Sequence, residues 1–74
     1  MIIKLNEEEI KLLKKAEIEF DPTKDYSEDE ALELADMVFD QEIEYSNYPS
    51  SNKKAVKLAV DYSELYDKLQ NLLS

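Results

Sequence analysis

The strongest constraint on the fold is that the 74-residue chain contains no glycine. Tight β-hairpin turns need positive φ angles, which glycine adopts at the lowest cost, so a sheet built from short hairpins is disfavoured. Proline, the other common turn residue, occurs only at Pro22 and Pro49. The sequence therefore predicts an all-α fold in which residues 1–74 form a single small helical domain.

A first amphipathic helix is predicted from about Glu7 to Ala16. Asn6 is a favoured N-cap residue, and Glu9 stands three positions later, as in a capping box. Apolar residues then recur at helical spacing and predict the buried side: Ile10, Leu12, Leu13 and Ala16. The next four residues alternate between polar and apolar, so residues 2–5 and 17–20 could pair as a minor two-stranded ribbon around this helix.

A second helix is predicted from a second capping box, formed by Ser27 and Glu30. It should end near Tyr45, with Asn47 as a left-handed cap before Pro49. Apolar residues spaced by three and four predict its buried side: Ala31, Leu34, Ala35, Val38, Phe39 and Ile43.

A third helix is predicted to begin near Ser51 or Asn52. Its apolar residues alternate between spacings of three and four, as in a packing seam: Ala55, Leu58, Tyr62, Leu65, Leu69 and Leu72. The short connection between Tyr45 and Ser50 allows the second and third helices to form an antiparallel hairpin. With the first helix beside it, this hairpin makes a small three-helix domain.

Negative charge is concentrated in the middle of the chain. Residues 17–45 contain twelve acidic residues and only Lys24, a net charge of −11, whereas the whole chain carries −9. On the second helix, five carboxylates follow one side at spacings of four, three, four and four. We call them the acidic stripe: Asp29, Glu33, Asp36, Asp40 and Glu44. The third helix differs, because Lys57 with Asp61 and Glu64 with Lys68 have the spacing of ion pairs.

The acidic stripe leads to the first functional hypothesis, a non-enzymatic module that docks a basic protein surface. Tyrosines favour interfaces, so Tyr45 and Tyr48 are candidate contacts at its rim, and Tyr66 is a further candidate. A narrower form is nucleic-acid mimicry, because carboxylates on successive helical turns lie about 5 to 6 Å apart, near the roughly 7 Å between phosphates of one strand. A small phage or mobile-element inhibitor of a nuclease would have this appearance.

Two other interpretations of the same residues stay open. The stripe can simply be a solubilising surface. Alternatively, the chain is a structural homo-oligomer without a dedicated ligand site, in its simplest form a homodimer. A chain of this size buries only about 60% of its unfolded surface, so pairing of the third-helix seam with a second copy would enlarge a marginal core.

Several other classes of function are disfavoured by the residue types. Without His, Cys, Arg or Gly, the chain lacks the usual proton carrier, thiol nucleophile and phosphate-binding loop, so no catalytic residues and no cofactor are expected. Asp21, Thr23, Asp25, Ser27 and Asp29 alternate as in a calcium loop, but Tyr26 replaces the required glycine, so no metal site is expected. The net charge also disfavours direct nucleic-acid or membrane binding. The early acidic residues do not resemble a signal peptide, which predicts a cytoplasmic protein.

Overall fold

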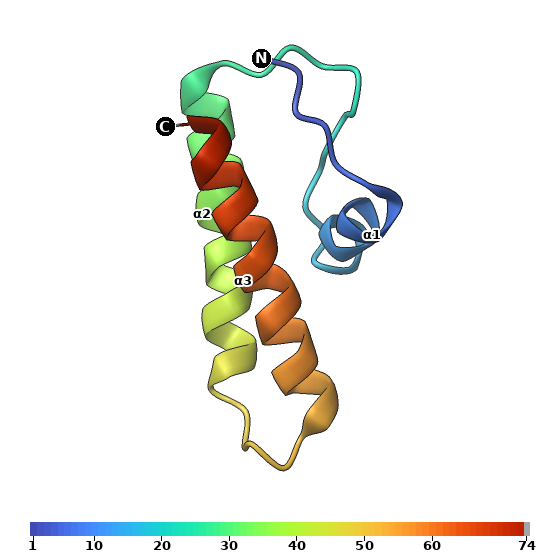
Figure 1. Ribbon diagram of the computed structural model, residues 1–74, viewed down its shortest axis with the longest axis vertical. Helices are drawn as coiled ribbons and strands as arrows, with labels where there is room; N and C mark the ends of the chain where they lie inside the picture. Colours follow the sequence, from blue (N-terminus) through green and yellow to red (C-terminus); the bar gives the residue numbers. More distant parts are fainter. Residues whose placement is uncertain (74) are drawn as a thin grey trace.

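Three helices make up most of the computed structural model, which describes residues 1–73 (Figure 1). They are α1 (Glu7–Lys15), α2 (Glu28–Ser46) and α3 (Lys53–Leu73). α2 and α3 lie side by side and antiparallel, while the short α1 crosses the direction of this hairpin next to α3 (Figure 1). The predicted all-α fold with a hairpin of the second and third helices is confirmed.

Local hydrogen bonds determine where α1 begins and ends. Asn6 and Glu9 exchange two hydrogen bonds of 2.8 Å, which complete the predicted capping box. The helix ends after Lys15. Glu17 then has a φ of 59°, a left-handed conformation that glycine adopts more easily than other residues. As a result the N–H of Ile18 donates to the carbonyl of Leu13 at 2.9 Å, and Ile18 turns back into the core.

The predicted ribbon between residues 2–5 and 17–20 is wrong. Ile2 forms an isolated antiparallel bridge with Asp25 instead, and the N–H of Tyr26 donates to the carbonyl of Met1 at 2.6 Å. The reason is that the left-handed turn at Glu17 breaks the extended run, and the bend around Pro22 brings the following residues beside the N-terminal segment. Residues 1–73 contain no β-strand longer than this single bridge.

The caps at the starts of the two long helices agree with the sequence, and the cap at the end of α2 does not. Ser27 and Glu30 form the second capping box, and the N–H of Ala55 donates to the side chain of Asn52 at 3.1 Å, so α3 begins one residue after Asn52. The expected left-handed cap at Asn47 is wrong, because Asn47 has φ −81° and ψ −8°. Its N–H continues the helical pattern by donating to the carbonyls of Ile43 and Glu44.

The core lies where the hairpin meets α1 and the N-terminal segment. Its buried side chains come from every part of the described chain: Ile3, Leu13, Ile18, Tyr26, Ala31, Leu34, Ala35, Val38, Tyr62, Leu65 and Leu69. Most of the predicted seam of α3 is used here, since Ala55, Tyr62, Leu65 and Leu69 are buried within the chain. Leu72, by contrast, is exposed.

Two residues predicted to be buried on α2 are exposed instead. Phe39 has 39% and Ile43 has 44% of its surface exposed. They lie on the side of α2 that α3 covers only partly, and α1 packs on the opposite side of the hairpin. A pattern of spacings identified them as apolar residues of a helix, but it could not show that one side of the hairpin has no cover.

Tyr62 connects all three helices. Its side chain is fully buried, its ring stacks on that of Tyr45 with a centroid distance of 5.8 Å, and its hydroxyl donates to the carbonyl of Leu12 at 2.7 Å. A second tie joins the same two helices, because Lys68 donates to Glu9 at 2.8 Å. α1 is therefore held against α3 by one buried and one surface interaction.

Replacing Tyr62 by Phe keeps the buried ring and removes the hydrogen bond to Leu12. We expect the free energy of unfolding to fall by about 0.5 to 1.5 kcal/mol, the usual net contribution of one such bond. Urea denaturation at pH 7 measures this change.

The same variant has a pH signature. Burial raises the pKa of Tyr62 to about 12 from 10.0, so the native state disfavours its ionisation. The wild type should therefore lose stability as the pH rises from 10.0 through about 12, and the Phe variant should lose less. Equal stability at pH 7 together with an equal alkaline loss would contradict the role given to the hydroxyl.

Candidate functional site

The five side chains of the acidic stripe are all exposed. They come from successive turns of α2, on the side turned away from its buried residues Ala31, Leu34, Ala35 and Val38. Because α2 is a continuous helix of 19 residues, the stripe extends over about 22 Å, at 1.5 Å per residue from Asp29 to Glu44. The structure thus presents these carboxylates on a straight, rigid element.

The ion pairs of the described residues do not involve the stripe. Four carboxylates form them: Glu9 with Lys68, Asp61 with Lys57, Glu30 with Lys24, and Asp25 with the amino group of Met1. Within residues 1–73, no ion pair reaches any of the five stripe carboxylates. The lysines lie on the N-terminal segment, α1, the connecting segment and α3, and α2 itself contains none.

One expected ion pair is replaced by another. Lys57 and Asp61 are paired at 3.2 Å, as their spacing predicted. Lys68 does not pair with Glu64, however, because its ammonium group contacts Glu9 of α1 at 2.8 Å. Glu9 is largely covered at this contact, and a tertiary partner of that kind cannot be inferred from spacing within one helix.

The tyrosines proposed as rim contacts have different environments. Tyr45 is half-buried and stacks on the buried Tyr62, so its ring belongs partly to the core. Tyr48 is 45% exposed and lies 5.7 Å from Tyr45, centroid to centroid, at the end of α2. Tyr66 contacts Phe39 across the hairpin at 5.0 Å. The structure therefore brings Tyr45 and Tyr48 together near Glu44, and it places Tyr66 on a different side.

The segment before α2 is held by its own polar contacts. Asp21 accepts hydrogen bonds from the N–H and the hydroxyl of Thr23, which lower the pKa of its carboxyl. The carboxylate of Glu30 contacts Lys24 and accepts a hydrogen bond from the backbone N–H of Ser27, and these contacts lower the pKa of Glu30 to about 2 from 4.5. In residues 1–73 there is no group of three or more acidic side chains arranged to hold a metal ion. Of the residues that resembled a calcium loop, Asp21 and Thr23 bond each other, Ser27 caps α2 and Asp25 pairs with the amino group of Met1.

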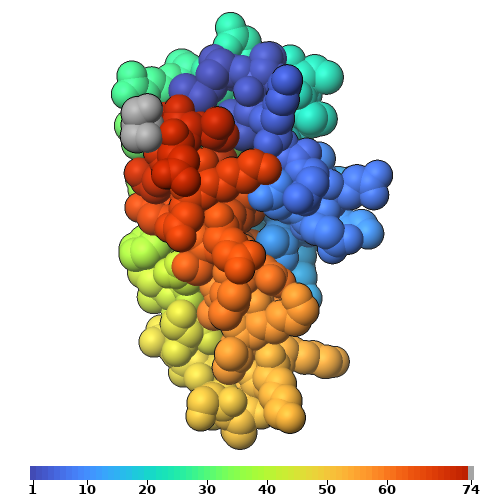
Figure 2. All heavy atoms as spheres, in the orientation of Figure 1, coloured from blue at the N-terminus to red at the C-terminus, as the bar shows by residue number. Residues whose placement is uncertain are grey.

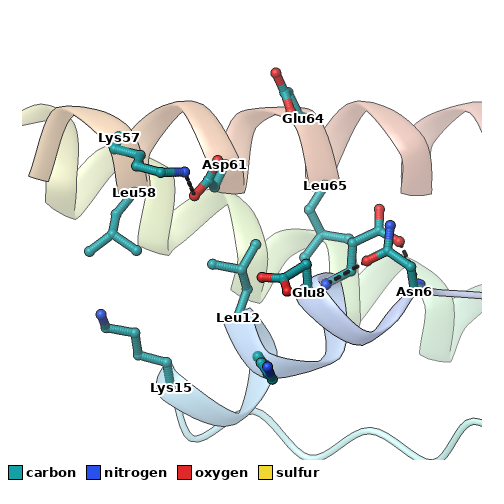
Figure 3. Close-up of a pocket in the computed structure, with 11 residues that line it drawn as sticks. Asn6, Glu8, Leu12, Lys15, Lys57, Leu58, Asp61, Glu64 and Leu65 are labelled. Carbon is teal, nitrogen blue, oxygen red and sulfur yellow. Dashed lines mark hydrogen bonds and ion pairs between the residues drawn. The ribbon is translucent and has the colours of Figure 1, made fainter. Parts of the chain in front are cut away.

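A groove of about 380 Å³ lies between α1 and α3. Figure 3 shows Leu12, Leu58 and Leu65 at its floor, with Lys15 extending towards the open side. Its walls carry both signs of charge, since Lys57 is paired with Asp61 at one edge and Glu8 stands near the other. A second hollow, of about 600 Å³, lies between residues 17–21 and α2.

Comparisons with protein-family models, with curated proteins and with solved structures found no match to this chain. No helix within the described residues is both long and apolar enough to cross a membrane.

Sequence reasoning missed one feature beside the stripe. Phe39 and Ile43 were assigned to the core, whereas the structure places them on the surface next to Asp36 and Asp40. A signal existed, because the apolar residues of α2 cover more of its circumference than one packing partner can bury.

Low pH tests the contact between Lys24 and Glu30. Since the folded pKa of Glu30 lies below its unfolded value of 4.5, the contact stabilises the fold above about pH 4.5, and this stability is lost as the pH falls through about 2. We expect Glu30→Gln, which can still cap Ser27, to lack this component of acid destabilisation. Thermal unfolding between pH 7 and 2 measures it, with Glu28→Gln as the matched change in net charge. Parallel curves for wild type and Glu30→Gln would contradict the assignment.

The stripe should cost stability in the isolated protein. Like charges three or four residues apart destabilise a helix by about 0.2 to 0.5 kcal/mol each, so Asp36→Asn with Asp40→Asn should stabilise the fold by about 0.5 to 1 kcal/mol. The gain should shrink as salt is added, because salt screens the repulsion. Glu17→Gln with Glu19→Gln, the same charge change in the connecting segment, is the control. A loss of stability in the stripe variant would mean that these carboxylates have stabilising partners.

Proposed function

We propose that this protein is a small, non-enzymatic interaction module that docks a basic protein surface through the acidic stripe. The observation that carries the proposal is the continuous row of five exposed carboxylates on one side of α2, all of which lie outside every ion pair of residues 1–73. Tyr48, which is exposed and contacts the half-buried Tyr45 just after α2, is the candidate aromatic contact of the partner.

The mechanism of binding is electrostatic complementarity followed by short-range contact. An uncompensated row of charges attracts a cationic partner over a distance of about a Debye length, roughly 8 Å at physiological salt, and favours one orientation. Charged contacts at a surface mainly increase the association rate, while aromatic and apolar contacts prolong the complex. Tyr48 is suited to the second role because its ring is exposed beside the stripe.

Nucleic-acid mimicry is the narrower form of this proposal. A nuclease or another nucleic-acid-binding protein has a basic channel whose cations are spaced for phosphates. Carboxylates on successive turns of α2, about 5 to 6 Å apart, come near the roughly 7 Å spacing along one strand. The rigidity of a single helix supports this form, since the spacing is maintained along the whole stripe.

The second candidate is the structural homo-oligomer, and the exposed apolar residues of the hairpin favour it. The seam of α3 is largely buried within one chain, so a second copy would have to use another surface. Light scattering on a sizing column distinguishes the two candidates. A strict monomer at several hundred micromolar would eliminate the oligomer.

The stripe is tested by capture of partners from a cell lysate of the source organism. The protein is immobilised on a column through its C-terminus, the lysate is passed over it, and bound proteins are eluted with a salt gradient. Asp36→Asn with Asp40→Asn should release its partners at a clearly lower salt concentration, because two of five carboxylates are removed, whereas Glu17→Gln with Glu19→Gln should behave as the wild type. Elution of the same partners at the same salt from both variants would show that the stripe is not the site.

Duplex DNA added to the same column tests mimicry. A partner held in a nucleic-acid channel should be displaced by DNA and should bind DNA when purified. Partners that remain bound at DNA concentrations saturating their own nucleic-acid sites would contradict mimicry, while leaving the more general docking proposal in place.

A further inference from the structure

One side of the hairpin of α2 and α3 is apolar and has no cover. We call it the open face, and it comprises five exposed apolar side chains: Leu32, Phe39, Ile43, Val56 and Val60. On α2 the first three are spaced by seven and four residues, and on α3 the last two are spaced by four, so each set lies on one side of its helix. Isolated apolar residues on a surface are ordinary, but a continuous apolar patch commonly marks an interaction site.

Contacts across the hairpin show that the two sets lie on the same side. The rings of Phe39 and Tyr66 meet at 5.0 Å, and nearer the hairpin tip a hollow of about 310 Å³ lies between the helices, lined by Ala59 and Val60 together with the polar residues Glu42, Ser46, Ser63 and Glu64. α1 and residues 17–26 pack on the opposite side, where they adjoin Leu58 of α3 and Leu34 of α2. In Figure 2, α2 and α3 form the left part of the molecule, without atoms of α1 over them.

The open face has the dimensions of a helix-binding groove. Because the helices are antiparallel, Leu32 lies near the C-terminal end of α3 and Val56 lies near the hairpin tip. The face therefore crosses from α2 to α3 over about 25 Å, which corresponds to roughly five helical turns. A third helix lying along two antiparallel helices is the usual way to bury such a surface, and residues 1–73 offer no sheet edge to which an extended peptide could add a strand.

Charge decides which helix fits. Asp29 precedes Leu32 by three residues, Asp36 precedes Phe39 by three, and Asp40 precedes Ile43 by three, so a carboxylate of the acidic stripe stands one turn from each apolar side chain of α2. On α3, Glu64 follows Val60 by four residues, while Lys53 and Lys57 precede Val56 and Val60 by three, so the carboxylate border of the open face is mainly that of α2. A second copy of this chain would bring another −9 to this border, and an anionic membrane or a nucleic acid would be repelled in the same way.

We infer that the open face is the docking groove for a cationic amphipathic helix of the partner, whose apolar side covers Phe39, Ile43 and Val60 and whose lysines or arginines meet Asp36 and Asp40. The inference rests on the proposed function and specifies the partner of the same surface. Contacts in the apolar groove would set how long the partner helix stays bound, and the bordering carboxylates would set its orientation.

The probe is a synthetic 18-residue peptide of Leu, Ala and Lys, with Leu at helical spacings of three and four and Lys on both flanks. A peptide of identical composition with scrambled order has the same charge and no apolar side. Affinities are measured by fluorescence anisotropy of the labelled peptides in 150 mM salt, and the site is mapped from amide chemical shifts of the ¹⁵N-labelled protein.

The expected result is binding of the amphipathic peptide at least tenfold tighter than the scrambled one, with the shifts concentrated around Phe39, Ile43 and Val60. Ile43→Gln with Val60→Gln changes two exposed side chains and should weaken binding at least tenfold. Met37→Gln with Leu72→Gln, two equally exposed apolar residues off the open face, should change it less than twofold. Asp36→Asn with Asp40→Asn should weaken binding and flatten its salt dependence. Circular dichroism verifies that each variant is folded.

Three results would overturn the inference. If both peptides bind equally, or if Ile43→Gln with Val60→Gln has no effect, binding does not involve an apolar groove. If the protein alone is a dimer by sedimentation equilibrium and that variant dissociates it, the groove belongs to a second copy. In each case the proposed function survives if the stripe variant still loses its lysate partners. If the stripe variant retains those partners while the amphipathic peptide binds as expected, the proposed function fails and the groove stands.

Discussion

The packing of Tyr62 is the interaction on which the rest of the structure depends. Its ring is buried where α2, α3 and α1 meet, it stacks on Tyr45 of α2, and its hydroxyl satisfies the carbonyl of Leu12 in α1. Because one residue faces two neighbours at once, α1 can lie only on one side of the hairpin. The position of Tyr62 on α3 therefore decides which side of the hairpin is covered and which remains open.

The distribution of charge follows from the same arrangement. Lys68 of α3 is drawn to Glu9 of α1, and Lys24 is used at the start of α2 by Glu30. Both interactions lie on or near the covered part of the molecule, and neither reaches the outer side of α2. The three lysines that form ion pairs within residues 1–73 are thus engaged away from the stripe, whose five carboxylates remain exposed. Exposed apolar residues lie next to that charge, and this combination is what makes the surface chemically specific.

Much of the fold could be predicted from local chemistry. Asn6 with Glu9 and Ser27 with Glu30 mark helix starts because a capping box involves residues only three apart, and the buried residues of α2 and α3 follow from helical spacing. The errors occurred where a distant residue was the deciding partner. The predicted ribbon is wrong because Ile2 pairs with Asp25. Spacing within α3 predicted Glu64 as the ion-pair partner of Lys68, whereas the structure pairs Lys68 with Glu9 of α1. The predicted left-handed cap at Asn47 is wrong for a local reason, since α2 ends there with Asn47 still in a right-handed helical conformation.

By itself, the sequence determined that the chain is helical, where its helices begin, and that Asp29, Glu33, Asp36, Asp40 and Glu44 share one side of one helix. These properties depend on backbone geometry and on residues within two turns of each other. Only the tertiary structure decided that none of these carboxylates forms an ion pair within residues 1–73, and that Phe39, Ile43 and Val60 are exposed. The physical reason is that burial and ion pairing depend on which side of the hairpin α1 occupies, and that choice is made by contacts between residues some fifty positions apart, such as Leu12 and Tyr62.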